Sequence, residues 1–147
     1  PYITVPDLVA KYGYPIESHD IFTSDGYNLT AHRIPHGRHH NTVGNRPVVF
    51  LMHGLLASSA DYLILGPSNA LAYYLADEGY DVWLGNARGS FYSRNHRTLN
   101  PDNPYGQFWR FSWDEIGLYD LIALIDYVLA FTHQSRLHYI VMFTRTM

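Results

Sequence analysis

The segment His53-Gly54-Leu55-Leu56 has the residue types and the position in the sequence that suit chemistry. It follows residues 48–52, an uninterrupted apolar run that is typical of a strand buried on both faces of a parallel sheet. Ligands of such sheets bind beyond the carboxyl ends of the strands. Because Gly54 lacks a Cβ, the chain can turn tightly and direct the backbone N–H of Leu55 into the crevice. Such an N–H stabilises the charge on an attacked carbonyl, although an ordinary turn would use the same residues.

Two strands are predicted ahead of this segment. Residues 16–23 and 27–34 flank Ser24-Asp25-Gly26, and an Asp-Gly pair between alternating segments is a hairpin signal. Residues 35–47 are rich in His, Gly, Asn and Arg, which indicates an exposed loop.

A helix and a second buried strand are predicted after it. The helix covers about residues 68–77, and Gly79 follows as a C-terminal stop. Its expected buried face consists of Leu71, Ala72, Leu75 and Ala76. Residues 80–84 form the apolar run of the strand.

The last two fifths of the sequence begin with a long irregular segment, residues 87–111. Ser112 and Glu115 then have the spacing of a capping box, which predicts a helix that ends near Phe131. Most sides of this helix are apolar, so we expect it to be largely buried. A third buried strand is predicted at 137–140. A hairpin followed by strands that alternate with helices predicts an α/β fold with a parallel sheet and helices on both faces.

Composition excludes several classes of protein. The 147 residues are 47% hydrophobic and 16% charged, which is typical of one globular domain and not of a disordered chain. The net charge of -3 argues against a nucleic-acid partner. Cysteine is absent, so the chain has neither disulfides nor thiolate metal ligands. No apolar run approaches the roughly 18 residues that a transmembrane helix needs.

A set of ordered motifs extends from about residue 5 to Ile140 and resembles the acid lipases of the gastric and lysosomal type, with their insect relatives. The motifs are Lys11-Tyr12-Gly13-Tyr14-Pro15, Thr23-Ser24-Asp25-Gly26-Tyr27, His32-Arg33-Ile34-Pro35-His36-Gly37, residues 48–56, residues 79–89, Phe108-Trp109 and Ser112-Trp113-Asp114-Glu115.

The resemblance implies the N-terminal part of an α/β-hydrolase fold. It also implies hydrolysis of triacylglycerols or cholesteryl esters at a lipid–water interface by a Ser-Asp-His triad, with no metal or organic cofactor. The position of Leu55 is that of an oxyanion donor in the family, and Gly54 and His53 shape its turn. Family members are secreted or lysosomal glycoproteins, and Asn28-Leu29-Thr30 is an N-glycosylation sequon that would be used at Asn28. Because the sequence begins with Pro1 and not with Met, we expect any signal peptide of the family to be missing from it.

The sequence departs from the family after Ile140. There the family continues into Gly-His-Ser-Gln-Gly, whereas this sequence continues with residues 141–147, Val-Met-Phe-Thr-Arg-Thr-Met. None of the nine serines has a glycine two positions away on both sides, and the triad Asp and His follow the Ser in this fold. We therefore expect residues 1–140 to be a hydrolase domain truncated before the nucleophile, and residues 141–147 to be an unrelated tail.

Two readings of the function remain open. The chain is either the first part of a lipase, inactive alone for lack of a nucleophile, or a non-catalytic lipase-like protein that binds lipid or a partner. A metal site at His36, His39 and His40 is a remote alternative, because a solvated loop explains these residues. Arg88, Arg94 and Arg97 form a cationic cluster that hydrogen bonding within the long loop, or contact with an anionic lipid or fatty acid, would explain. Trp83, Trp109 and Trp113 are most simply anchors of the core or of loops. Packing or an acyl pocket would explain residues 62–65 equally well.

Overall fold

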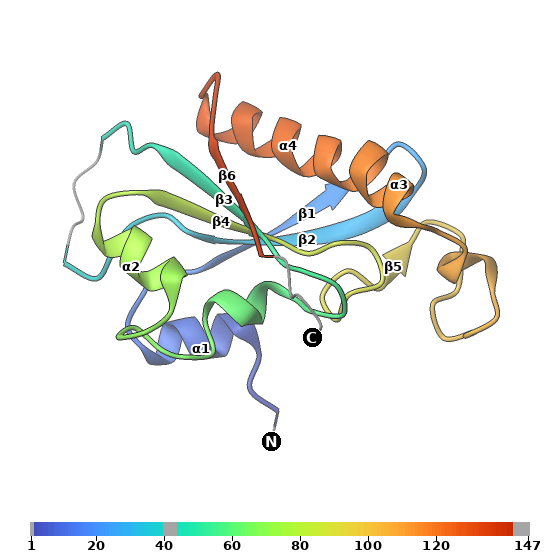
Figure 1. Cartoon of the computed structure of the whole chain (residues 1–147), viewed down its shortest axis with the longest axis horizontal. Helices are drawn as coiled ribbons and strands as arrows, with labels where there is room; N and C mark the ends of the chain where they lie inside the picture. The colour runs from blue at the N-terminus through green and yellow to red at the C-terminus, as the bar shows by residue number, and fades with distance from the viewer. Residues whose placement is uncertain (1, 40–43, 143–147) are drawn as a thin grey trace.

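A six-stranded mixed sheet forms the centre of the computed structural model, which describes residues 2–39 and 44–142 (Figure 1). The main strands lie in the order β1-β2-β4-β3-β6, and the short β5 pairs with β2. Strands β3, β4 and β6 are parallel to one another, whereas β2 is antiparallel to β1, β4 and β5. The strands are β1 (Glu17–Phe22), β2 (Tyr27–Ile34), β3 (Val48–Met52), β4 (Asp81–Gly85), β5 (Asn95–His96) and β6 (His138–Val141).

Helices cover both faces of the sheet, as the sequence predicts. Helices α1 (Val5–Lys11) and α2 (Leu71–Asp77) lie on one side, and α4 (Ile122–Thr132) lies on the other (Figure 1). Alternate residues of β3 enter different cores: Val49 and Leu51 pack with α1 and α2, whereas Val48 and Phe50 pack with α4. Both faces of β3 are therefore buried, which explains why its sequence is apolar without interruption.

The hairpin is confirmed, and one helix was not expected. Strands β1 and β2 pair from Glu17↔Arg33 to Phe22↔Asn28 around a turn in which Gly26 has a φ of 100°. Helix α1 precedes them, and the Thr4 side chain caps it by accepting a hydrogen bond from the Asp7 N–H.

Helix α2 begins later than predicted, and its buried face matches the predicted one except at Leu71 and Tyr73. Residues 66–70 form turns, and the helix starts at Leu71, whose side chain is 38% exposed. Ala72 and Ala76 are buried as predicted and Leu75 is partly buried, whereas Tyr73 joins the buried face and packs against the rings of Tyr12 and Tyr14 in the loop after α1. Gly79 ends this segment with a φ of 99°, as expected.

The predicted capping box is present, but the helix it opens is not uniform. Ser112 and Glu115 cap α3 (Trp113–Glu115), and the chain then forms a π-helical segment, η3 (Ile116–Leu121), before α4. The expectation that this helix is largely buried is wrong. Leu118 and Ile122 are 63% and 52% exposed, because the helix contacts the sheet along one side only.

Strand β6 is also more exposed than its apolar sequence predicts. All four of its residues are exposed, because among the described residues the strand pairs only with β3. Val141 is the last residue of β6, and residues 143–147 lie outside the described part of the chain. No helix in residues 2–39 and 44–142 has the length and apolar composition that crossing a membrane requires.

Helix α4 provides a first test of the packing. Leu124 is fully buried in the core between α4 and the sheet, whereas Ile122 on the same helix is mostly exposed. We expect Leu124→Ala to lower the free energy of unfolding by about 2–5 kcal/mol, and Ile122→Ala to change it by less than about 0.5 kcal/mol. Denaturant unfolding of both variants measures the difference. Equal effects would contradict this assignment of the two faces of α4.

Candidate active site

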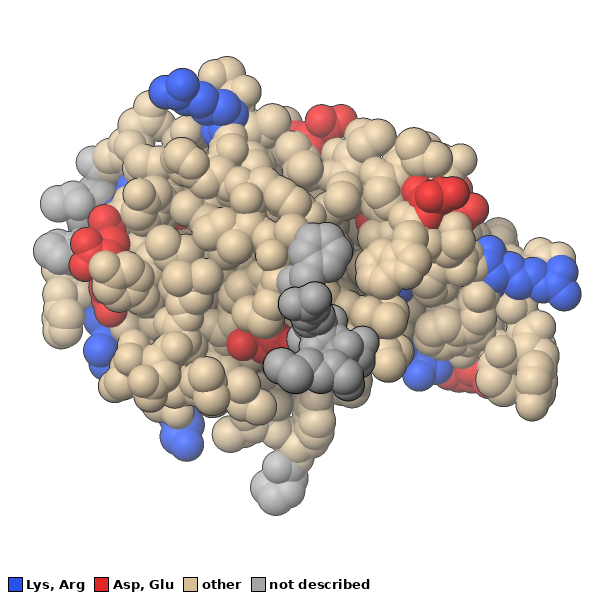
Figure 2. Space-filling model, in the orientation of Figure 1, with Lys and Arg blue, Asp and Glu red and all other residues tan. Residues whose placement is uncertain are grey.

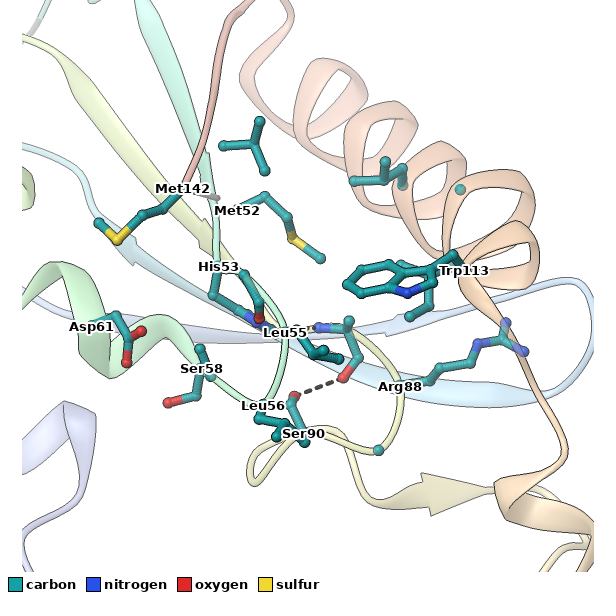
Figure 3. A pocket seen from close by; sticks show the side chains of 18 of the residues that line it. Met52, His53, Leu55, Leu56, Ser58, Asp61, Arg88, Ser90, Trp113 and Met142 are labelled. Carbon is teal, nitrogen blue, oxygen red and sulfur yellow. Dashed lines mark hydrogen bonds between the residues drawn. The ribbon is translucent and has the colours of Figure 1, made fainter. Parts of the chain in front are cut away.

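A pocket of about 860 Å³ lies at the carboxyl ends of β3, β4 and β6, where the parallel strands end together. Two loops form one side of it: residues 53–58 after β3 and residues 87–91 after β4. The other side is largely aromatic and aliphatic, and Trp113 projects from the helical segment toward the Leu55 turn (Figure 3). The pocket also includes Trp109, Phe111, Ile116, Gly117, Leu121, Tyr139, Val141 and Met142.

The predicted oxyanion turn forms part of this pocket. Gly54 and Leu55 both contact it, and the Leu55 side chain is 61% exposed. Among the described residues, the backbone N–H of Leu55 has no hydrogen-bond partner. Leu56, which is 98% exposed, has a φ of 56° and so adopts the left-handed conformation that non-glycine residues rarely adopt. The turn therefore contributes a backbone N–H without a partner among the described residues to the lining of the pocket, and its role as an oxyanion donor stays a prediction.

The side chain of His53 joins the two loops. Its Nδ1 lies 2.8 Å from the carbonyl oxygen of Gly54, and its Nε2 accepts a 3.0 Å hydrogen bond from the Ala87 N–H. Burial lowers the pKa of His53 below its ordinary value, although the Gly54 carbonyl and Asp61 oppose this shift. The neutral ring therefore links the end of β3 to the end of β4.

A buried polar network supports both loops from beneath. The Asn86 side chain accepts a hydrogen bond from the Ser59 N–H and donates one to the Thr30 carbonyl, each at 2.9 Å. Ser93 Oγ donates to the Asn86 carbonyl at 2.8 Å, and the Thr30 N–H donates to Ser93 at 3.0 Å. Ser59 and His32 share a hydrogen bond of 2.8 Å, and burial lowers the pKa of His32 to about 4.

An ion-pair cluster fixes the loop after β4 to the hairpin and to η3. Arg88 donates two hydrogen bonds to Asp25, at 2.7 and 2.9 Å, and its Nε donates to Asp120 at 2.8 Å. The Arg88 backbone N–H donates to the same Asp120 carboxylate at 2.8 Å, and its guanidinium stacks 3.9 Å from the Tyr27 ring centre. Burial alone would lower the pKa of Arg88, but the two carboxylates raise it above its ordinary value.

Comparison with known proteins agrees with this geometry. Residues 47–141 match the family described as the alpha/beta hydrolase fold, and residues 5–66 match the partial alpha/beta-hydrolase lipase region. The chain belongs to the α/β-hydrolase family. Its fold is similar to that of an esterase from Pyrococcus furiosus, with a TM-score of 0.60 and 20% identity over 90% of this chain and 42% of the esterase.

Within this family the chain belongs with the acid lipases. It is 53% identical to Lipase 1 of Drosophila melanogaster over 93% of this chain and 29% of that lipase. It is 48% identical to the gastric triacylglycerol lipase of Bos taurus over 94% of this chain and 34% of that lipase. The chain thus spans about a third of the length of the curated relatives that it matches.

The other candidate residues of this chain lie in different environments. Tyr62 and Leu63 are buried in the core beside α1 and α2, Ile64 and Leu65 are exposed, and none of the four contacts the pocket. Asn28 lies within β2, paired with both β1 and β5, and its Oδ1 is buried without a hydrogen-bond partner in the described structure. Its glycosylation stays a prediction.

The remaining expectations concern His-rich, cationic and tryptophan positions. His40 lies outside the described residues, and residues 2–39 and 44–142 contain no group of three or more His, Asp or Glu placed to hold a metal. Arg94 hydrogen-bonds with the loop at residues 101–102, and Arg97 lies over Phe22. These contacts, together with the ion pairs of Arg88, indicate that the three arginines stabilise the long loop through hydrogen bonds and ring contacts. Trp83 is fully buried, whereas Trp109 and Trp113 contact the pocket.

Several residues of the site escaped the sequence analysis. His32, Ser59, Asn86 and Ser93 support the pocket, yet each is an ordinary polar residue in its local sequence. The buried Asp120 was hidden in an apolar helix. The sequence contained one signal of this role, the presence of Asp120 among apolar helix residues. A buried carboxylate requires a cationic partner or hydrogen-bond donors, so the aspartate alone indicated a buried ion pair or hydrogen bond.

The His32 network makes stability depend on pH. The pKa of His32 is about 4 in the folded chain and near 6.5 in the unfolded chain, so its contribution is complete above pH 6.5 and is lost as the pH falls toward 4. Between pH 6.5 and 4.5, we expect His32→Gln to flatten the decline in unfolding free energy by about 1.4 kcal/mol per pH unit. His39→Gln, in an exposed loop, is the matched control. An NMR titration that places the pKa of His32 near 6.5 would contradict this prediction.

The Arg88 cluster makes a second prediction. Removing the cation leaves Asp120 buried without its partner, so we expect Arg88→Met to lower the unfolding free energy by about 3–5 kcal/mol. The double variant Arg88→Met with Asp120→Leu should regain part of this loss, because it removes the unpaired charge. Arg94→Met breaks an exposed pair with Asp102 and should cost less than about 1 kcal/mol. Denaturant unfolding that ranks Arg94→Met as the more harmful change would refute the assignment.

Proposed function

We propose that this chain supplies the oxyanion-binding part of a serine ester hydrolase that acts on lipid esters such as triacylglycerols or cholesteryl esters. The unpartnered Leu55 N–H at the carboxyl end of β3, beside a large pocket, is the observation that carries the proposal. Donors fixed in advance at the place where charge develops stabilise a tetrahedral intermediate without reorganising during the reaction.

The lining of the pocket supports an apolar acyl group as the substrate. Trp109, Phe111, Trp113, Ile116 and Leu121 form a continuous apolar side opposite the oxyanion turn. Leu55, Leu56 and Phe91 are exposed at the loops that border it. Figure 2 shows that charged side chains lie mainly near the outline of this face, with one acidic group close to its centre. A face with few charged side chains away from its outline suits contact with a lipid–water interface.

The chain itself offers no reactive serine at the pocket. Ser90 Oγ donates to the Ala87 carbonyl at 2.6 Å, and Ser58 caps η1 (Ser59–Tyr62). Within the described residues, the one Ser–His hydrogen bond joins Ser59 and His32, which are both buried and do not contact the pocket. These contacts support the proposal that the described residues bind the substrate and that a nucleophile is not among them. The proposed location is secreted or lysosomal, as in the family that the motifs resemble.

A graft into a relative tests the proposed function. Residues 5–140 would replace the matching region of Drosophila melanogaster Lipase 1, to which the chain is 53% identical. We expect the graft to hydrolyse p-nitrophenyl butyrate and tributyrin. Leu55→Pro removes the donor N–H and should lower kcat by about 10²–10³-fold. Leu55→Ala keeps the N–H and is the matched control, so its kcat should stay within about threefold of the parent graft.

The unmodified 147-residue chain completes the test. We expect it to show no turnover that a serine-directed phosphonate inhibits. Turnover of this kind would contradict the absence of a nucleophile. Equal activity of Leu55→Pro and Leu55→Ala grafts would remove Leu55 from the oxyanion site, and an inactive parent graft that folds normally would refute the proposed function.

A further inference from the structure

The imidazole of His53 uses both of its nitrogens at the base of the pocket. Nε2 lies 3.0 Å from the Ala87 backbone nitrogen, and Nδ1 lies 2.8 Å from the Gly54 carbonyl oxygen. The ring is almost completely buried, so water does not compete for either position. These two contacts restrict the ring to one protonation state.

The chemistry of the partners identifies that state. A backbone N–H can only donate, so Nε2 must carry a lone pair toward Ala87. A carbonyl oxygen can only accept, so Nδ1 must carry the proton toward Gly54. His53 is therefore neutral and protonated on Nδ1. A second proton, on Nε2, would face the Ala87 N–H and break the link between the loops.

The hydrogen bond to Gly54 also determines the orientation of Leu55. The carbonyl of Gly54 and the N–H of Leu55 belong to one trans peptide unit, in which the two groups lie in one plane and point in opposite directions. Holding the carbonyl toward the imidazole directs the Leu55 N–H away from it. The free donor of the pocket is thus oriented by a side chain that does not itself need to touch the substrate.

The other end of the imidazole has a firm anchor. Ala87 lies between Asn86, whose side chain is held by Ser59 and Thr30, and Arg88, whose backbone N–H is held by the Asp120 carboxylate. The Ala87 N–H therefore has little freedom to move. The link through His53 transmits this rigidity from the β4 loop to the turn after β3.

We propose that His53 is a positioning residue of the proposed hydrolase, whose Nδ1-protonated ring holds the Gly54–Leu55 peptide in the orientation that presents the Leu55 N–H to the oxyanion. This inference rests on the proposed function for its catalytic meaning. The tautomer of His53 and the orientation of the Gly54–Leu55 peptide do not depend on the proposed function, and both can be measured without enzymatic turnover.

The first experiment reads the tautomer in the 147-residue chain. Long-range ¹H–¹⁵N correlation NMR at neutral pH distinguishes a protonated Nδ1 from a protonated Nε2 for each histidine. We expect His53 to have the proton on Nδ1. A proton on Nε2, or rapid exchange between the two tautomers, would overturn the inference whatever the activity of any graft.

The second experiment separates the two nitrogens in the Lipase 1 graft. His53→Asn places an amide N–H close to the position of Nδ1, so it can still hold the Gly54 carbonyl. His53→Gln places a carbonyl oxygen near the position of Nε2, so it can accept from Ala87 but cannot hold Gly54. We expect kcat to fall by about 10²-fold in His53→Gln and by less than about tenfold in His53→Asn, with KM changed by less than about twofold in both.

The pattern across variants distinguishes positioning from general damage. His39→Gln is the matched control and should leave both constants unchanged, because His39 is exposed and outside the pocket. Equal losses in His53→Asn and His53→Gln, or a loss in KM alone, would overturn the positioning role. An inactive parent graft that folds normally would refute the proposed function and the catalytic role of His53. The NMR measurement of the His53 tautomer would still test the structural inference independently.

Discussion

The hydrogen bond from the Ala87 N–H to His53 Nε2 is the interaction on which the pocket depends. Parallel strands β3 and β4 end side by side, and each leaves a loop with backbone groups that the sheet no longer pairs. His53 satisfies one group from each loop, and the Asn86 side chain accepts a hydrogen bond from the Ser59 N–H and donates one to the Thr30 carbonyl of β2. The loops are therefore held by side chains rather than by ladder hydrogen bonds, which leaves the Leu55 N–H free.

The polar groups beneath the pocket have different energetic roles. His32, Ser59 and Asn86 are neutral, so their mutual hydrogen bonds offset most of the cost of burial. Arg88 and Asp120 are charged, and such a pair contributes less than its contacts suggest because both ions lose their hydration. What the ion pair provides is position. It fixes the loop after β4 against η3, where a π-helical turn places the Asp120 carboxylate in the interior.

Most of the sheet could be predicted from the sequence, because β2, β3 and β4 carry their pattern locally. The run 48–52 is apolar at every position since both of its faces are covered, and the Asp-Gly turn sets the hairpin register. The errors arise where burial depends on distant partners. The residues of β6 are apolar but exposed, since their burial requires a neighbour beyond β3. Asp120 and Arg88 are 32 positions apart, so no local pattern joins them. Helix α1 was missed although Thr4, Pro6 and Asp7 are helix-start signals.

The position of β6 bears on how the proposed oxyanion turn would meet a nucleophile. The Met142 N–H donates to the Met52 carbonyl at 3.1 Å, so the chain leaves β6 directly beside the residue that precedes His53. Tyr139, Val141 and Met142 already contact the pocket. A serine on a sharp turn that follows a strand in this position would face the Leu55 N–H across a short gap, because parallel neighbours deliver their next residues to the same edge of the sheet. In the proposed function, the ends of β3 and β6 would therefore bring the oxyanion donor and the nucleophile to the same edge of the sheet.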